Sequence, residues 1–146
     1  MVLVVVLVLV ILRVTGLNPR GARPGFWLSG NLITVPVTDW SFADSYPTIE
    51  VQTNTRYLIP HSVTIWCVSY ENHLYLQAVG KIWKRNLVRD PHVRIKIVNQ
   101  LYDRAVVSVS DPTEFFGVEQ NMAKKYSRWT PSKDFIPDTF FRVKDN

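Results

Sequence analysis

The pattern of apolar and polar residues divides this chain into an apolar start, a short linker and a longer folded part. Residues 2–12 are an unbroken run of valine, leucine and isoleucine. Beyond residue 31, apolar residues alternate with polar ones or recur every three or four positions, as in half-buried strands and amphipathic helices. The pattern predicts a hydrophobic anchor over residues 1–17, a proline- and glycine-rich linker over residues 18–31, and one folded domain over residues 32–146.

Strand-like alternation dominates the folded part. It is clearest over residues 49–57, where Ile49 and Val51 share one face and Glu50 and Gln52 share the other. This pattern predicts a half-buried strand. Further strands are predicted over residues 32–37, 62–69, 73–79, 93–97, 101–110 and 139–143.

Two segments predict helices. A short helix begins at residue 80 and must end near Asp90, because a residue that precedes proline is disfavoured in the α region. The second begins at Asp111, which can cap a helix, followed by Pro112 at the first helical position and Glu114 three residues after the cap. An apolar stripe predicts that this second helix packs against the sheet: Phe115, Val118, Met122, Tyr126 and Trp129.

The order of these elements, with mostly short connections, indicates a mainly β protein with two or three peripheral helices. Sheets with this many antiparallel strands usually close into a barrel, because closure removes exposed strand edges. We therefore predict a β-barrel preceded by an N-terminal hydrophobic helix.

The apolar start has three interpretations. Eleven helical residues span only about 17 Å, less than the roughly 30 Å of a hydrocarbon core. Continuation to Leu17 gives about 25 Å, and Arg13 could extend to the interface. We expect a single-pass membrane anchor; the alternatives are a secretory signal peptide and a buried strand. Because Arg13, Arg20 and Arg23 follow the run, the positive-inside rule places the folded domain in the cytoplasm.

Composition excludes some chemistry. The net charge of +5 suits an anionic ligand, a nucleic acid or an acidic membrane equally. The single cysteine, Cys67, excludes an internal disulfide and any multi-cysteine metal site. His61, His73 and His92 lack the spacing of metal ligands, and no nucleophile or nucleotide-binding motif is present. Any chemistry would therefore depend on a bound cofactor.

A basic segment, GKIWKRN over residues 80–86, follows the hairpin that turns at residues 70–72. Positive charge and free N–H groups at a helix start favour an anionic group such as a phosphate. Lys84 and Arg85 are adjacent and point about 100° apart on a helix, so Lys81 is the better candidate for a phosphate contact. The alternative is a solvated basic face.

The run W-x-x-N-L-x-x-D-P-x-V over residues 83–93 resembles the flavin-binding split-barrel families. These are the pyridoxamine-phosphate-oxidase-like fold and, within it, the deazaflavin-dependent nitroreductases. Pro60, the hairpin around Asn72 and Lys81 occupy the expected places, and the similarity covers residues 50–141. The resemblance implies an antiparallel Greek-key split barrel that forms a homodimer. It also implies a flavin-type cofactor, either FMN or the deazaflavin F420, and hydride transfer to a small or lipophilic acceptor.

The resemblance implies roles for eight residues. The implied cofactor-binding residues are Arg56, Ser62, Gln77, Lys81, Trp83, Lys84 and Asn86, and the implied catalytic residue is His61. Structural roles remain alternatives: Trp83 as a core residue, Asn86 as a loop tie, and His61 as a strand end.

Two features favour a second function. The glycine-rich basic turn of the family is absent over residues 54–59, and the loop over residues 78–81 is shortened. A split barrel that has lost its cofactor and serves as a binding or scaffold module at a membrane is therefore the alternative. Nucleic-acid binding is a third and weaker hypothesis, because of the anchor and because the aromatic residues occupy core-like positions.

Overall fold

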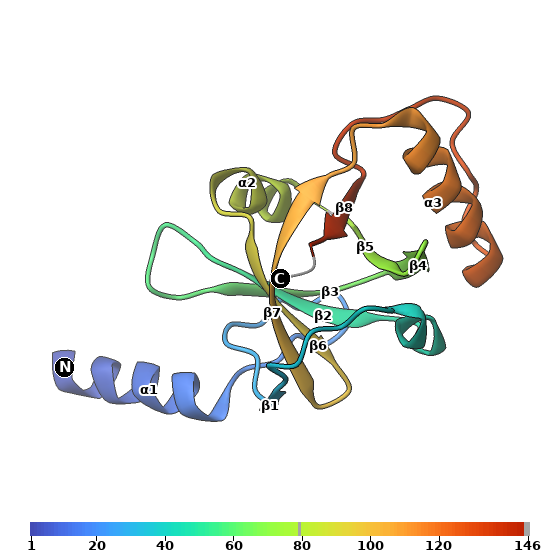
Figure 1. Ribbon diagram of the computed structural model, residues 1–146. Helices are drawn as coiled ribbons and strands as arrows, with labels where there is room; N and C mark the ends of the chain where they lie inside the picture. Colours follow the sequence, from blue (N-terminus) through green and yellow to red (C-terminus); the bar gives the residue numbers. More distant parts are fainter. Residues whose placement is uncertain (79, 145–146) are drawn as a thin grey trace.

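The computed structural model describes residues 1–78 and 80–144, except for the side chain of Lys81. The described part is mainly β, with strands curled around a core and helices at the periphery (Figure 1). The elements are α1 (Val2–Thr15), β1 (Asn31–Leu32), the 3-10 helix η1 (Ser41–Ser45), β2 (Ile49–Thr53), β3 (His61–Ile65), β4 (Cys67–Tyr70), β5 (His73–Gln77), α2 (Lys81–Arg89), β6 (His92–Ile97), β7 (Gln100–Ser108), α3 (Pro112–Lys125) and β8 (Phe140–Val143).

The strands form one curled sheet in the order β3-β2-β6-β7-β8-β5-β4, and β1 pairs with β7 off this path. Neighbouring strands along the path are antiparallel, whereas β1 and β7 are parallel. The edge strand β3 continues through Trp66 into β4, the strand at the other edge. The sheet is therefore a half-barrel, and the prediction of a mainly β, barrel-like fold is confirmed.

Three predicted strands differ from the observed ones. The strand expected over residues 62–69 is divided at Trp66, because the chain passes there from one edge of the sheet to the other. The strand expected over residues 49–57 ends at Thr53, whose partner His61 is the first residue of β3, so residues 54–60 form the connecting loop. The strand expected over residues 32–37 is reduced to β1, which ends at Leu32.

Both helices predicted in the folded domain are present. α2 spans Lys81–Arg89 and ends before Pro91. α3 begins as predicted, because a side-chain oxygen of Asp111 accepts a hydrogen bond of 2.8 Å from the Glu114 N–H. Its apolar face packs with strands β4, β5 and β8 in a second core that includes Val68, Tyr75, Phe115, Val118, Met122 and Phe140.

The main core fills the inside of the half-barrel. Alternate residues of the strands point into it, and Ile49, Val51 and Thr53 of β2 are buried while Glu50 and Gln52 are half-buried on the outer face. Trp40, from the loop before η1, and Trp83, from α2, close the core and are at most 1% exposed. The alternation predicted for β2 is therefore confirmed.

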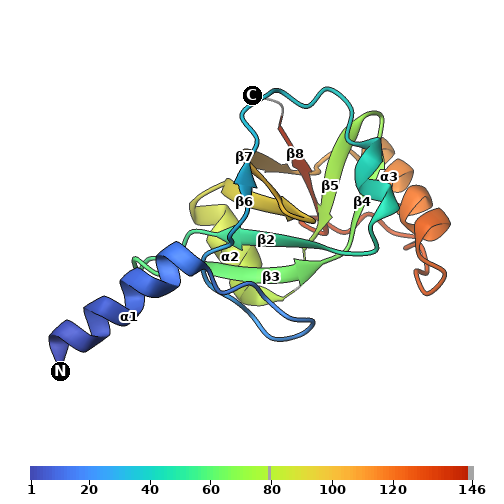
Figure 2. The same cartoon turned by 90° about the horizontal axis from the view of Figure 1, so that it is seen from below.

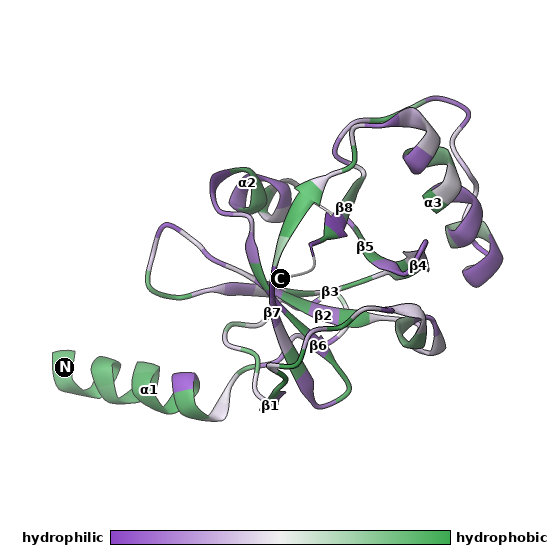
Figure 3. Cartoon of the chain, viewed as in Figure 1, coloured by the Kyte–Doolittle hydropathy of each residue, from purple (hydrophilic) through white to green (hydrophobic). Residues whose placement is uncertain are grey.

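Helix α1 projects away from the half-barrel, and none of its residues is buried (Figures 1 and 2). It is apolar along its length apart from Arg13 and Thr15 in its last turn (Figure 3). Fourteen residues span about 21 Å. Within the described residues, no helix combines the length and the apolar character needed to cross a membrane. The predicted spanning helix over residues 1–17 is thus unsupported, and the alternative of a buried strand is wrong.

The segment after α1 lies against the half-barrel. The Leu17 N–H donates to the carbonyl of Trp27, and Phe26 donates back to Leu17. Gly25 then pairs with Ser62 of β3 through two backbone hydrogen bonds of 2.8 and 3.0 Å. The chain between α1 and β1 therefore covers part of the edge of the sheet.

Candidate functional site

Two hollows lie at opposite ends of β2. The first, which we name the aromatic groove, has a volume of about 470 Å³ and is lined by Gly21, Ala22, Thr48, Thr64, Ile65, Trp66 and Gln77. The second, which we name the polar pocket, has a volume of about 710 Å³ and is lined by Arg13, Trp27, Leu28, Gln52, Asn54, His92, Val93, Arg94, Asp103, Arg104 and Ala105. Both volumes lie within the range typical of small-molecule sites.

The aromatic groove is organised by Trp66, at the point where β3 passes into β4. The indole is half-buried and stacks on Tyr126, with ring centroids 4.5 Å apart and an angle of 6° between the planes. Trp129 lies behind it at 6.1 Å. Offset stacking of this kind restricts the orientation of an aromatic ring. The groove therefore has a flat apolar surface held in a fixed plane.

Gln77 connects the groove to the start of α2. Its backbone N–H donates to the carbonyl of Trp66 at 3.1 Å, and it is the last residue of β5. Three residues later Gly80 precedes α2 with φ +83°, a backbone conformation that favours glycine. Among the described side chains, none caps this helix start. Its first N–H groups can therefore donate hydrogen bonds to an anion.

The basic residues predicted near this helix start differ in position. Lys81 is the first residue of α2, but its side chain lies outside the described residues. Lys84 is half-buried one turn later, and Arg56 is exposed in the loop between β2 and β3. Among the described side chains, neither lysine nor arginine lines the aromatic groove.

His61 and Ser62 begin β3 but line neither hollow within the described residues. Ser62 is fully buried beneath Gly25, and its hydroxyl has no described hydrogen-bond partner. A Cβ on Gly25 would lie 2.7 Å from that hydroxyl oxygen, so the close approach requires glycine. The His61 Nδ1 is also buried without a described partner, and burial lowers the pKa of this imidazole. His61 is therefore neutral at neutral pH.

Trp83 and Asn86 of α2 have structural contacts. Trp83 is 1% exposed in the main core, and its ring meets Phe141 edge-on at 5.8 Å. Asn86 is 4% exposed, and its amide donates to the Thr53 hydroxyl at 3.1 Å, which ties α2 to β2. Of the predicted site residues with described side chains, Gln77 lines the aromatic groove. Trp66 was missed, because an aromatic residue in an apolar strand resembles a core residue.

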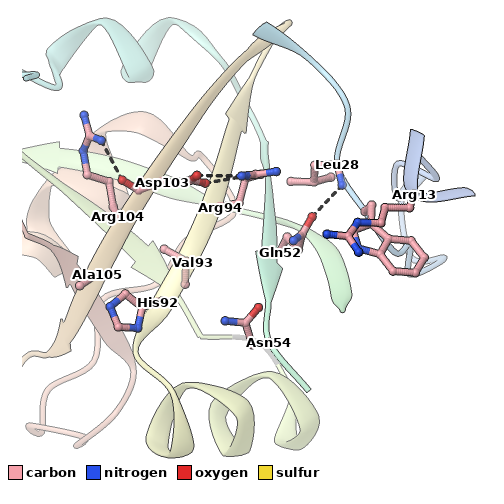
Figure 4. A pocket seen from close by; sticks show the side chains of 11 residues that line it. Arg13, Leu28, Gln52, Asn54, His92, Val93, Arg94, Asp103, Arg104 and Ala105 are labelled. Carbon is pink, nitrogen blue, oxygen red and sulfur yellow. Dashed lines mark hydrogen bonds and ion pairs between the residues drawn. The ribbon is translucent and has the colours of Figure 1, made fainter. Parts of the chain in front are cut away.

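The polar pocket is built on the outer face of β2, β6 and β7, where Gln52, Arg94 and Asp103 lie side by side in register. Arg94 donates to both carboxylate oxygens of Asp103, at 2.6 and 2.7 Å (Figure 4). At the lower rim, the Asn54 amide donates to Asp90, and this hydrogen bond lowers the pKa of the Asp90 carboxyl.

Comparison with solved structures supports the fold. An F420-H2 dependent reductase is 15% identical, with a TM-score of 0.55, over 67% of this chain and 94% of that one. A FAD-binding protein from Mesorhizobium loti is 14% identical, with a TM-score of 0.53, over 70% and 83%. A conserved hypothetical protein from Mycobacterium tuberculosis is 20% identical, with a TM-score of 0.53, over 70% and 73%. No family model and no curated protein matches the chain. The split-barrel fold implied by the resemblance is thereby confirmed.

Proposed function

We propose that this protein is a split-barrel oxidoreductase that binds a flavin-type cofactor, FMN or the deazaflavin F420, in the aromatic groove. It would transfer hydride to a small or lipophilic acceptor. The observation that carries the proposal is the Trp66 indole, held by Tyr126 in a groove between β3, β5 and the N-terminal segment. The fold shared with an F420-H2 dependent reductase and a FAD-binding protein supports it.

The residues of the groove fit a planar, partly polar ring. Trp66 and Ile65 offer apolar surface for the ring, while the Thr64 hydroxyl and the Gln77 amide could hydrogen-bond its polar edge. The uncapped start of α2 and Lys81 would hold the phosphate. A bound flavin or deazaflavin supplies the hydride chemistry. The role of the chain is to orient the ring, exclude water from it and neutralise the phosphate.

The roles predicted for the remaining residues stay predictions. His61 is half-buried, and its imidazole is neutral at neutral pH. One ring nitrogen then carries a proton and can donate a hydrogen bond, while the other can accept one. Lys84 is a candidate for contacts with an anionic tail that extends beyond the groove. Arg56 lies in the loop after Thr53, at the end of β2 that is away from the groove. The homodimer implied by the resemblance is also part of the proposal.

Association with a membrane through α1 is also part of the proposal, with the folded domain on the cytoplasmic side. None of the apolar side chains of α1 is buried, and most are exposed, so burial in lipid would remove this surface from water. Sedimentation of the full chain with phospholipid vesicles, compared with a variant that lacks residues 2–15, tests this. Equal sedimentation of the two proteins would contradict the proposed role of α1.

Titration with FMN, riboflavin and F420, followed by cofactor fluorescence, tests the groove. Trp66→Ala should weaken binding of all three at least tenfold, whereas Trp66→Phe, which keeps an aromatic ring, should retain most of the affinity. Lys81→Ala should weaken FMN binding by about 1.5–3 kcal/mol, as for a hydrogen bond to a charged group, and leave riboflavin binding unchanged. Arg85→Ala, at an exposed position of the same helix and with the same charge change, is the matched control. An equal effect of the Lys81 and Arg85 variants would show that the phosphate site is misplaced.

The same titration distinguishes the oxidoreductase from the alternative function, a cofactor-free binding module. This alternative is favoured by the absence of glycine from residues 54–59 and by the short loop over residues 78–81. Failure of the wild-type protein to bind any of the three compounds would support the module and exclude the oxidoreductase.

A further inference from the structure

The polar pocket lies at the far end of β2 from the aromatic groove and has a different character. Its walls come from two sources: the outer face of β2, β6 and β7, and the N-terminal segment that carries Arg13 and Trp27. The N-terminal segment is fixed there, because the Leu28 N–H donates to the Gln52 side-chain oxygen at 2.7 Å. Figure 4 shows Arg13 extending from α1 toward Gln52 across this hollow.

Hydrogen-bond donors converge on the pocket. Because the oxygen of the Gln52 amide accepts from Leu28, its NH₂ group is left to donate. Arg94 uses Nε and Nη2 for Asp103, so its other terminal nitrogen remains available and faces Leu28 and Gln52 in Figure 4. Arg13 is exposed and makes no ion pair or hydrogen bond through its side chain within the described residues. Two guanidinium groups and an amide thus have unused donors there.

The charges around the pocket favour an anion. The carboxylate of Asp103 lies on one wall, but both of its oxygens are engaged by Arg94. His92 is paired with Asp90 through Nδ1 at 2.8 Å. Arg104 lines the wall, but its side chain points away from Arg13 and stacks over Trp40 and Tyr102, so it contributes no donor. The Arg13 charge is therefore left uncompensated.

We propose that the polar pocket binds a phosphate ester, held between Arg13 and Arg94 and hydrogen-bonded by the Gln52 NH₂ group. Guanidinium groups match the geometry of phosphate oxygens and can donate two parallel hydrogen bonds. Arg13 lies in the last turn of an apolar helix that has no buried residue, so the ester is either the headgroup of a phospholipid or a free phosphate compound. The ester also bridges α1 and the half-barrel. This site is independent of the flavin proposal, because the aromatic groove shares no residue with it.

One experiment with two parallel titrations distinguishes a phospholipid headgroup from a free phosphate compound. Both titrations use the full chain. Glycerol 3-phosphate is titrated by calorimetry, and vesicles of phosphatidylcholine with and without phosphatidylglycerol are titrated by sedimentation. Arg13→Gln should weaken binding about tenfold or more, as expected for loss of a charge-assisted contact. The matched control is Arg20→Gln, which removes the same charge from the same exposed segment, outside the pocket wall.

Each result is decisive. A selective effect of Arg13→Gln on glycerol 3-phosphate supports a free phosphate ester, and a selective effect on the phosphatidylglycerol vesicles supports a lipid headgroup. Equal effects of the two variants in both titrations would mean non-specific attraction by net charge and overturn the proposal, as would the absence of binding in both titrations. Flavin binding is measured separately, because its loss or retention does not bear on whether the polar pocket binds a phosphate ester. Unchanged circular dichroism confirms that the variants are folded.

Discussion

Helices α1 and α3 have the same length, 14 residues, and opposite relations to the rest of the molecule. α3 begins with a capped turn, presents an apolar stripe and buries Phe115, Val118 and Met122 in the second core. α1 has no capping side chain and no buried residue, although its sequence is far more apolar. A high apolar content does not by itself make a helix pack against the sheet. A helix packs when its apolar residues recur periodically, because they then form one face while the polar residues occupy the face that remains in water.

The comparison extends to the polar contacts at the ends of the two helices. The end of α3 is fastened to the half-barrel: the Lys125 ammonium donates to the Cys67 carbonyl at 2.8 Å, and the Tyr126 hydroxyl contacts the same carbonyl and that of Pro47. α1 ends at Arg13 and Thr15, and the Thr15 hydroxyl bonds within its own helix. α3 therefore stabilises the fold, whereas α1 is available to a partner.

The largest expected effect is the loss of a buried ring from α3. Phe115 is fully buried and contacts Phe140 and Phe135. Phe115→Ala should lower the free energy of unfolding by about 3–5 kcal/mol, through lost burial and the cavity left behind. Urea unfolding measures this. A loss below about 1 kcal/mol would mean that α3 contributes little to the core and would remove the contrast with α1.

The next effect depends on pH. Burial in the main core raises the pKa of the Cys67 thiol to about 11 from an ordinary value of 9.0. Well below pH 9 the thiol is protonated in both the folded and unfolded states. Between pH 9 and 11 the unfolded chain loses this proton more readily, so stability falls as pH rises, by up to about 2–3 kcal/mol.

Cys67→Ala provides the control for this pH dependence, since it removes the thiol and leaves the other titrating groups in place. Urea unfolding of both proteins at pH 8, 9.5 and 10.5 should give a smaller decrease for the variant. Parallel decreases would show that the thiol is not protected by burial in the main core. The native thiol should also resist a disulfide reagent at pH 8 and react once the chain is unfolded.

A smaller effect on stability is expected from the N-cap of α3. Asp111→Ala removes the acceptor of the Glu114 N–H and should cost about 1 kcal/mol. Asp111→Asn, which retains an accepting oxygen, should recover most of that loss. Thermal unfolding of the two variants measures the difference. If both variants lost the same stability, the contribution would come from the charge and not from the hydrogen bond.

The difference between α1 and α3 also explains which elements of the fold could be predicted from the sequence. The start and apolar face of α3 were predicted because the cap, the proline and the stripe are local signals, although the helix ends at Lys125, before Tyr126 and Trp129 of the predicted stripe. β2 was predicted because its alternation is local. The division of the strand at Trp66 was not predictable, because it follows from the curl of the sheet and not from any nearby residue. Glycine and proline in residues 18–31 indicated irregular structure, but the pairing of Gly25 with Ser62 joins positions far apart in the chain.

The candidate sites show the same limit. The start of α2 was predictable from its basic residues and the proline that ends it. The two hollows were not, since each is assembled from strands and the N-terminal segment, and Trp66 and Arg13 have no motif around them. Conversely, Trp83 and Asn86 lie in a recognisable run but are buried by packing that the run does not specify.

The smallest expected effect is in α1 itself. Leu7→Ala truncates a side chain that is 59% exposed, on a helix without buried residues. The free energy of unfolding should therefore change by less than about 0.5 kcal/mol, in contrast to Phe115→Ala. Vesicle sedimentation should respond, because the same side chain would be buried in lipid. Destabilisation of the free protein by more than about 1 kcal/mol would mean that α1 packs on the half-barrel or on a second copy in solution. An unchanged response in both measurements would leave the exposure of α1 without a function.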